Sequence, residues 1–159
     1  MLTIKRVFIS TCLLLSLLLS SSLVSAETTD QDRKVMMKYR QLFMETKGKH
    51  AKAMNLLLKN KLSLNHIVLH AEALAAMAEG MLLIFPAGST GGQSRAMDEI
   101  WDESGKLSLD FKNKVSVMHG EALKIVEVAK QGNYKQIKKQ MAVFANNGCR
   151  SCHSDYRGE

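Results

Sequence analysis

The chain has 159 residues, with 22 Lys and Arg against 15 Asp and Glu, and only three cysteines. This length fits a single domain of ordinary size, and so few cysteines exclude a secreted domain held together by several disulfides. The lysines are scattered along predicted helices instead of clustered, so we expect a solvated basic surface and no nucleic-acid binding.

Residues 1–26 predict a secretory signal peptide. Lys5 and Arg6 give a positive start, a leucine-rich run follows, and a small-residue Val-Ser-Ala site ends the segment. The apolar run is shorter than the ~20 residues that a membrane-spanning helix needs, so we expect no stable membrane span. An uncleaved N-terminal anchor is the alternative. Residues 27–159 are then expected to form one periplasmic domain.

The first two segments with helical periodicity run from about 32 to 59 and from about 63 to 85. A proline and several glycines end the second one. Residues 86–105 predict a long connection whose Ile100 and Trp101 fold back onto the core. The expected apolar faces comprise Val35, Met36, Tyr39, Phe43, Met54, Leu57 and Leu58 in the first segment, and Ile67, Ala71, Leu74, Ala78, Met81, Leu82 and Phe85 in the second.

The third segment spans about 108–131, with Ser108 as its N-cap, and the fourth runs as one helix from about 134 past residue 153. Gly132 and Asn133 predict the short turn between them, which makes the two helices antiparallel neighbours. The expected faces comprise Phe111, Val115, Met118, Ala122, Ile125, Val126 and Ala129, and then Ile137, Met141, Phe144, Ala145, Cys149, Cys152, His153 and Tyr156. Four such helices predict an all-α, antiparallel four-helix bundle.

The sequence Cys-Arg-Ser-Cys-His at 149–153 has the C-x-x-C-H spacing of c-type haem attachment. On a helix, Cys149, Cys152 and His153 project to one side. The two thiols can then form thioethers to the haem vinyl groups while His153 ligates the iron. We expect one covalently bound haem c near the C-terminus.

Other interpretations of the motif remain open. A thioredoxin-like redox pair needs a strand and helix around it, and the chain predicts no strands. A structural zinc site needs four ligands, and the motif offers three. The spacing can also arise by chance. We assign no role to His50, His66, His70 and His119.

The arrangement of motifs resembles the cytochrome c′ family, the class II c-type cytochromes. The haem motif stands at the end of the chain and is followed by Tyr156-Arg157. The first predicted helix contains the run Tyr-Arg-Gln-Leu-Phe-Met at 39–44, and residues 85–89 with Ile100-Trp101 resemble the family's inter-helix loop. The match covers essentially the whole mature chain and implies a four-helix bundle.

The resemblance also implies roles for individual residues. Met44 would face the distal side of the iron, as a second metal ligand beside His153. Arg40 would lie near a haem propionate, and Arg157 near the proximal imidazole. From the residues alone, Met44 is equally an ordinary core methionine and Arg40 a solvated helix arginine.

We therefore expect a periplasmic monohaem electron carrier with Met44 on the iron. The alternative is a high-spin protein in which Met44 stays off the iron and small gases such as nitric oxide or carbon monoxide bind. The basic charge predicts redox partner proteins with an acidic docking face. The resemblance implies a homodimer packed through the first two helices. No catalytic triad, carboxylate pair or phosphate loop stands out, so we do not expect an enzyme.

Overall fold

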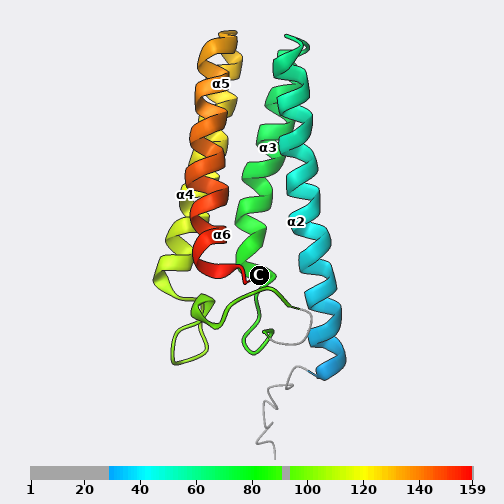
Figure 1. The fold of residues 1–159 in the computed structure, drawn as a ribbon, viewed down its shortest axis with the longest axis vertical. Helices are drawn as coiled ribbons and strands as arrows, with labels where there is room; N and C mark the ends of the chain where they lie inside the picture. Colours follow the sequence, from blue (N-terminus) through cyan, green and yellow to red (C-terminus); the bar gives the residue numbers. More distant parts are fainter. Residues whose placement is uncertain (1–28, 91–93, 159) are drawn as a thin grey trace, which may run out of the picture.

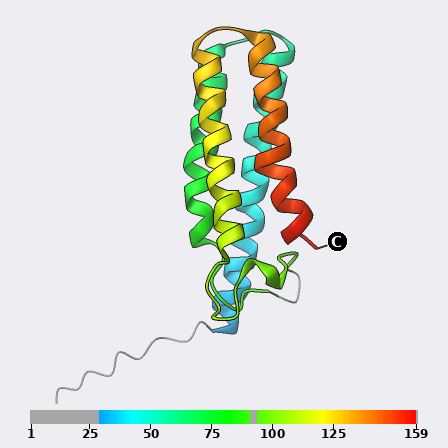
Figure 2. The same ribbon diagram turned by 90° about the vertical axis from the view of Figure 1, so that its left-hand side faces the viewer.

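The computed structural model describes residues 29–90 and 94–158, and the predicted signal peptide at 1–26 lies outside this part of the chain. The described residues form four long helical units, which lie side by side and alternate in direction (Figures 1 and 2). The units are α2 (Asp30–Lys59), α3 (Leu64–Gly80), α4 (Leu109–Lys130) and a C-terminal unit made of α5 (Tyr134–Val143), η3 (Phe144–Arg150) and α6 (Ser151–Tyr156). The predicted antiparallel four-helix bundle is confirmed.

The helices begin and end where side chains satisfy free backbone groups. The Thr29 hydroxyl accepts from the Asp32 N–H while the Asp32 carboxylate accepts from the Thr29 N–H, a capping box that starts α2 slightly earlier than predicted. Ser108 caps α4 as predicted, accepting from a backbone N–H of the first turn at 3.2 Å. Gly132, at a φ of +79°, and the capping side chain of Asn133 form the predicted turn into α5.

The interior of the bundle is apolar, and the predicted faces of the second and third helices supply most of it. Every residue predicted for the third face is buried, and for the second only Leu82 is not, at 37% exposed. The first face is partly wrong, because Val35 and Tyr39 are 57% and 49% exposed. They lie on the first turns of α2, which extend past the end of α3 and lack that helix as a packing surface (Figure 1).

The connection between α3 and α4 folds across one end of the bundle (Figure 1). It begins with the 3₁₀ turn η1 (Met81–Leu83) and contains a second, η2 (Asp98–Ile100). Ile100 is 1% exposed, and the Trp101 indole N–H donates to the Phe85 carbonyl at 3.1 Å. The prediction that Ile100 and Trp101 fold back onto the core is confirmed.

One stretch of the described residues, Leu64–Leu83, is long and apolar enough to cross a membrane, with a mean hydropathy of 1.3. It coincides with α3 and η1. Helix α3 packs against both α2 and α4, and its buried side chains belong to the bundle core. Only 33% of its most apolar window is buried, and Leu69 and Leu83 are 58% and 80% exposed, so packing in the bundle accounts for part of the composition.

The fourth helical unit is not the continuous α-helix that the sequence predicted. Residues 144–150 form the π-helical segment η3, whose i to i+5 hydrogen bonds widen the turn and change which side chains face inward. Ala145, predicted on the buried face, is exposed, and Gly148 is buried instead. A Cβ at Gly148 would lie 3.3 Å from the Met118 Cα, so the lack of a side chain lets η3 approach α4 closely.

Candidate haem site

A cavity of about 670 Å³ lies between α2 and the C-terminal unit, with residues of α3 and α4 behind it. This volume is within the range of sites for small molecules and cofactors. The cavity brings together every site residue that the sequence and the resemblance singled out: Arg40, Met44, Cys149, Cys152, His153 and Arg157. Its apolar lining includes Leu74, Met81, Phe85, Phe111, Met118 and Phe144.

One wall of the cavity carries the C-x-x-C-H motif. Cys149 belongs to η3, whereas Cys152 and His153 belong to α6, so the motif crosses a junction between π and α geometry. The prediction that one regular α-helix aligns the three side chains is wrong in this detail, although all three line the cavity. Both cysteines are free and partly buried, and burial raises the pKa of each thiol, so both are protonated at neutral pH.

His153 is the one imidazole among the described residues that line the cavity. His153 lies at the rim of the cavity and is exposed to solvent on one side. The protein atoms on its other side partly desolvate the imidazole ring. This desolvation lowers the His153 pKa, and the positive charges of Arg157, Lys47 and Arg95 lower it further. The ring therefore stays neutral, with a nitrogen lone pair available to a metal, to a lower pH than an ordinary histidine.

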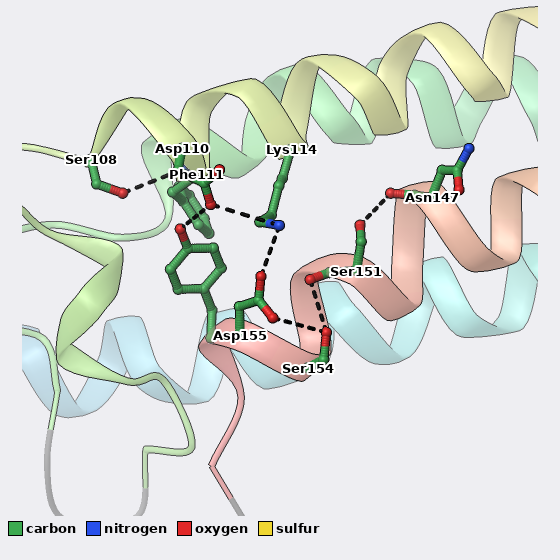
Figure 3. A network of polar contacts seen from close by, with 9 residues as sticks. Ser108, Asp110, Phe111, Lys114, Asn147, Ser151, Ser154 and Asp155 are labelled. Carbon is green, nitrogen blue, oxygen red and sulfur yellow. Dashed lines mark hydrogen bonds and ion pairs between the residues drawn. The ribbon is translucent and has the colours of Figure 1, made fainter.

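Polar contacts fasten α6, which carries part of the motif, to α4 (Figure 3). The Asp155 carboxylate pairs with the Lys114 Nζ at 2.8 Å, and the Tyr156 hydroxyl donates to the Asp110 carboxylate at 2.5 Å. The Tyr156 ring also packs edge-on against Phe111, with the ring centroids 5.3 Å apart. These contacts of two consecutive residues hold the last turn of α6 against α4.

The chain beyond α6 pairs with the connection between α3 and α4. The Gly158 N–H donates to the Arg95 carbonyl at 2.9 Å, and the Arg95 Nε donates back to the Gly158 carbonyl at 3.0 Å. This pairing keeps Arg95 and Arg157 at the rim of the cavity. Both guanidinium charges act on His153, as its lowered pKa indicates.

The opposite wall is α2, where Arg40 and Met44 lie four residues apart on one face. Arg40 is 6% exposed, its Nη2 donates to the Ser89 carbonyl at 2.7 Å, and its guanidinium lies 4.6 Å from the centroid of the Phe85 ring. Its Nη1 is buried without a hydrogen-bond partner among the described residues. Since buried donors are normally satisfied, this free N–H fits an acidic group of a cofactor bound in the cavity.

Lys47 also faces the cavity, and the sequence analysis missed it. Its Nζ lies 2.7 Å from the Met81 sulfur and 3.1 Å from the Met118 sulfur, and no ion pair to it occurs among the described residues. Desolvation lowers the Lys47 pKa to about 8. The signal that could have found it is its spacing, three residues after Met44 on the same helix.

The family model described as Cytochrome C′ matches residues 35–157. The chain belongs to the cytochrome c′ family. Cytochrome c′ of Pararhodospirillum photometricum is 30% identical to it over 122 residues, which cover 75% of this chain and 93% of that protein. Cytochrome c′ of Rhodopseudomonas palustris is 29% identical over 129 residues, covering 76% of this chain and 80% of that protein.

Solved structures of cytochromes c′ have the same fold. The ferric protein from Alcaligenes xylosoxidans matches with a TM-score of 0.67 at 22% identity, covering 80% of this chain and 96% of that one. A nitrosyl complex of a variant of that cytochrome matches with a TM-score of 0.65 at 23% identity, covering 79% and 96%. At these identities the likeness establishes the four-helix architecture.

The cofactor follows from the family. Cytochromes c′ carry covalently attached haem c, so the predicted cofactor is confirmed, and Cys149 and Cys152 are present in the C-terminal region. When bound, haem c would supply an iron that can bind a protein ligand and a small external ligand. Among the described residues, no group of three or more His, Cys, Asp or Glu side chains is arranged to hold a metal ion, so the zinc alternative has no ligand set.

Proposed function

We propose that the protein is a haem-based receptor for small uncharged gases such as nitric oxide or carbon monoxide. In this proposal Cys149 and Cys152 would hold the haem, His153 would ligate its iron, and Met44 would lie where the gas binds. The main support for the proposal is that the two sides of the cavity offer iron ligands of different strength. The lining has one imidazole, on the α6 side, whereas the α2 side offers the thioether of Met44.

The chemistry of the α2 side supports selection for small neutral ligands. Met44 is half-buried and packs against the apolar core, and the side chains that α3, α4 and η3 contribute to the cavity are mostly apolar, whereas Arg40 and Lys47 reach it from α2. A charged ligand would lose its hydration in such surroundings, whereas a diatomic gas loses very little. Met44 would then act as an apolar gate in front of the iron.

Two arginines have supporting roles in this proposal. The free Nη1 of Arg40 would donate to a haem propionate, which would satisfy the buried donor. Arg157 would lie beside the proximal imidazole and help to keep His153 neutral. Neither residue would touch the gas.

The comparisons support gas binding better than the electron-transfer prediction. Structures of the Alcaligenes xylosoxidans cytochrome include a nitrosyl complex and a ferrous variant with bound NO. Electron transfer with Met44 as the sixth ligand is the second candidate function. The position of Met44 favours it, since a His/Met pair is a ligand set that raises the reduction potential of a c-type haem.

An absorption spectrum of the haem-loaded protein separates the two functions. For the gas receptor we expect a high-spin ferric spectrum and a large shift when carbon monoxide is added to the reduced protein. A methionine-to-iron band in the far red, with no carbon monoxide shift, would instead establish Met44 as a ligand and electron transfer as the function.

A pair of methionine variants sharpens this test. Met44→Ala should leave the spin state high and increase the rate of carbon monoxide binding, because the gate is removed. Met37→Ala is the matched control, since Met37 also lines the cavity from α2. If Met44→Ala converts a low-spin spectrum to a high-spin one, Met44 ligates the iron and the gas-receptor proposal is wrong.

We also propose that the protein acts in the periplasm as a homodimer. Val35, Tyr39 and Leu42 are all about half exposed or more and repeat at i, i+4 and i+7, which gives α2 an apolar stripe facing away from the core. One solved relative is described as having an unusual ligand-controlled dimer dissociation. Sedimentation equilibrium of the haem-loaded protein tests the dimer, and Leu42→Lys is expected to yield monomers.

A further inference from the structure

Charge is unevenly distributed along the bundle. Two long stretches of sequence, residues 46–71 and 128–154, contain no Asp or Glu. The fold brings parts of both stretches to one end, where the α2–α3 and α4–α5 turns lie side by side, opposite the connection between α3 and α4 (Figure 2). Six exposed lysines lie on and beside these two turns, and we call this surface the basic end: Lys59, Lys61, Lys130, Lys135, Lys138 and Lys139.

The positive charge of the basic end is largely uncompensated. Among the described residues, Lys130 is the one member found in an ion pair, at 3.8 Å from Glu72, and that distance makes the pair weak. The opposite end of the molecule carries exposed charges of both signs, including Arg95 and Lys106. The connection between α3 and α4 carries four exposed carboxylates: Asp98, Glu99, Asp102 and Glu103.

The two turns of the basic end form one surface. The Tyr134 hydroxyl donates to the Lys61 carbonyl at 3.0 Å, which joins the α4–α5 turn to the α2–α3 turn. Leu56 and Leu62 are 64% and 53% exposed beside the lysines. Lys61 has a φ of 51°, a region in which glycine or asparagine is more common, so a lysine stands here despite the backbone's preference.

We propose that the basic end docks on an anionic membrane surface, with its lysines against lipid phosphates and Leu56 and Leu62 at the headgroup level. Clusters of four to eight basic residues are attracted to anionic lipids, and exposed apolar side chains among them add binding by entering the interface. An acidic protein would also attract the lysines, but it offers no layer into which two separated exposed leucines, one in the last turn of α2 and one in the α2–α3 turn, could insert. The proposal goes beyond gas binding and does not depend on which ligand the iron takes.

This docking would turn the haem away from the membrane. Along the fourth helical unit, His153 lies twenty residues from the α4–α5 turn, or roughly 30 Å at the α-helical rise. The cavity would therefore face the solvent while the protein is bound, and a bound partner at the basic end would be too remote for direct contact with the haem.

Co-sedimentation with vesicles tests the proposal on the haem-loaded protein. We expect binding to vesicles of phosphatidylcholine with 30 mol% phosphatidylglycerol at low salt, and little binding to pure phosphatidylcholine or at high salt. The triple variant Lys135→Gln, Lys138→Gln, Lys139→Gln should bind roughly 100-fold more weakly. Its matched control removes three exposed lysines nearer the haem end, Lys34→Gln, Lys38→Gln and Lys112→Gln, and should bind almost as well as the natural chain.

Three outcomes would overturn the proposal. Absence of binding to the anionic vesicles would do so, and so would equal losses in the two triple variants, because net charge alone would then explain the binding. Retention on poly-glutamate without vesicle binding would assign the basic end to an acidic protein.

Carbon monoxide binding by vesicle-bound protein is a separate readout: an unchanged rate is expected, and a strongly reduced rate would contradict the orientation. A failure of gas binding in solution would affect only the proposed function.

Discussion

The two walls of the haem cavity are held in place by different kinds of contact. On the proximal side, α6 is fixed by the Lys114–Asp155 ion pair, the Tyr156–Asp110 hydrogen bond and the pairing of the C-terminal residues with the α3–α4 connection. On the distal side, Arg40 provides the specific contacts, through Ser89 and over the Phe85 ring, while Met44 is held by apolar packing.

This difference is relevant to haem chemistry. Hydrogen bonds and ion pairs depend on direction, so they hold an imidazole at a defined angle, whereas apolar packing is non-directional. In the proposed arrangement, His153 would thus be supplied by a fixed wall, and the opposite face of the haem would lie against a wall that tolerates small displacements. Such an arrangement suits an iron that keeps one protein ligand and exchanges the other.

The largest expected effect is on the attachment of the haem to the proximal wall. In the double variant Cys149→Ser, Cys152→Ser, both thioethers are lost, and we expect acidified acetone to extract all of the pigment from the protein. The natural protein should keep its colour in the precipitate under the same treatment. A double variant that also retained its pigment would contradict the assignment of these cysteines.

The next largest effect concerns Lys47 on the distal wall. The pKa of Lys47 is lowered from 10.5 to about 8, because burial disfavours the protonated form in the folded state. The resulting loss of stability is complete below about pH 8 and disappears above about pH 10.5, where the lysine is neutral in both the folded and the unfolded chain. Lys47→Met should therefore raise the free energy of unfolding at pH 7 by about 1 to 2 kcal/mol, allowing for partial access of the side chain to water.

Denaturant unfolding of the haem-loaded protein at several pH values checks this prediction. The natural chain should gain stability between pH 8 and 10.5, and the Lys47→Met protein should lack that gain. Lys49→Met, which removes an exposed lysine of the same helix, is the control. Equal pH profiles for the three proteins would show that Lys47 is not desolvated.

A smaller effect is expected at the hydroxyl of Tyr156 on the proximal wall. Tyr156→Phe removes its hydrogen bond to Asp110 and leaves the packing against Phe111, so unfolding should become easier by about 1 kcal/mol. Tyr39→Phe, at a half-exposed position on α2, should change stability little. If the two variants behave alike in urea titrations, the hydroxyl does not anchor α6.

The smallest effect is the contribution of Asp155 to acid stability. Its hydrogen bond to Lys114 lowers the Asp155 pKa, so the contact stabilises the fold above the ordinary carboxyl pKa of 3.8 and the stabilisation disappears as the pH falls further. Asp155→Asn should make the loss of stability with acid slightly less steep. Thermal unfolding of the natural chain and of the Asp155→Asn variant between pH 3 and 7 measures this change. Salt at 1 M should reduce the difference between the two proteins, because the Asp155–Lys114 pair is exposed.

Much of the fold was predictable because local pattern and packing agree along most of the chain. The spacing of Phe111, Val115 and Met118 predicted the buried face of α4, and Ser108, Gly132 and Asn133 predicted helix ends that were confirmed. The error at Val35 and Tyr39 has a different origin. Periodicity shows which residues share a face, but it does not show how far the neighbouring helix extends along that face.

The sequence alone determined the four amphipathic helices and the covalent haem, because periodicity and the C-x-x-C-H spacing are local properties. Tertiary structure alone decided the π-helical turn at η3, since the close approach of Gly148 to Met118 involves residues thirty positions apart. It also decided that Lys47 points into the cavity, that the Arg40 Nη1 is left free there, and that two acid-free stretches meet at one end. Burial and the pairing of distant residues depend on which surfaces meet in the folded chain.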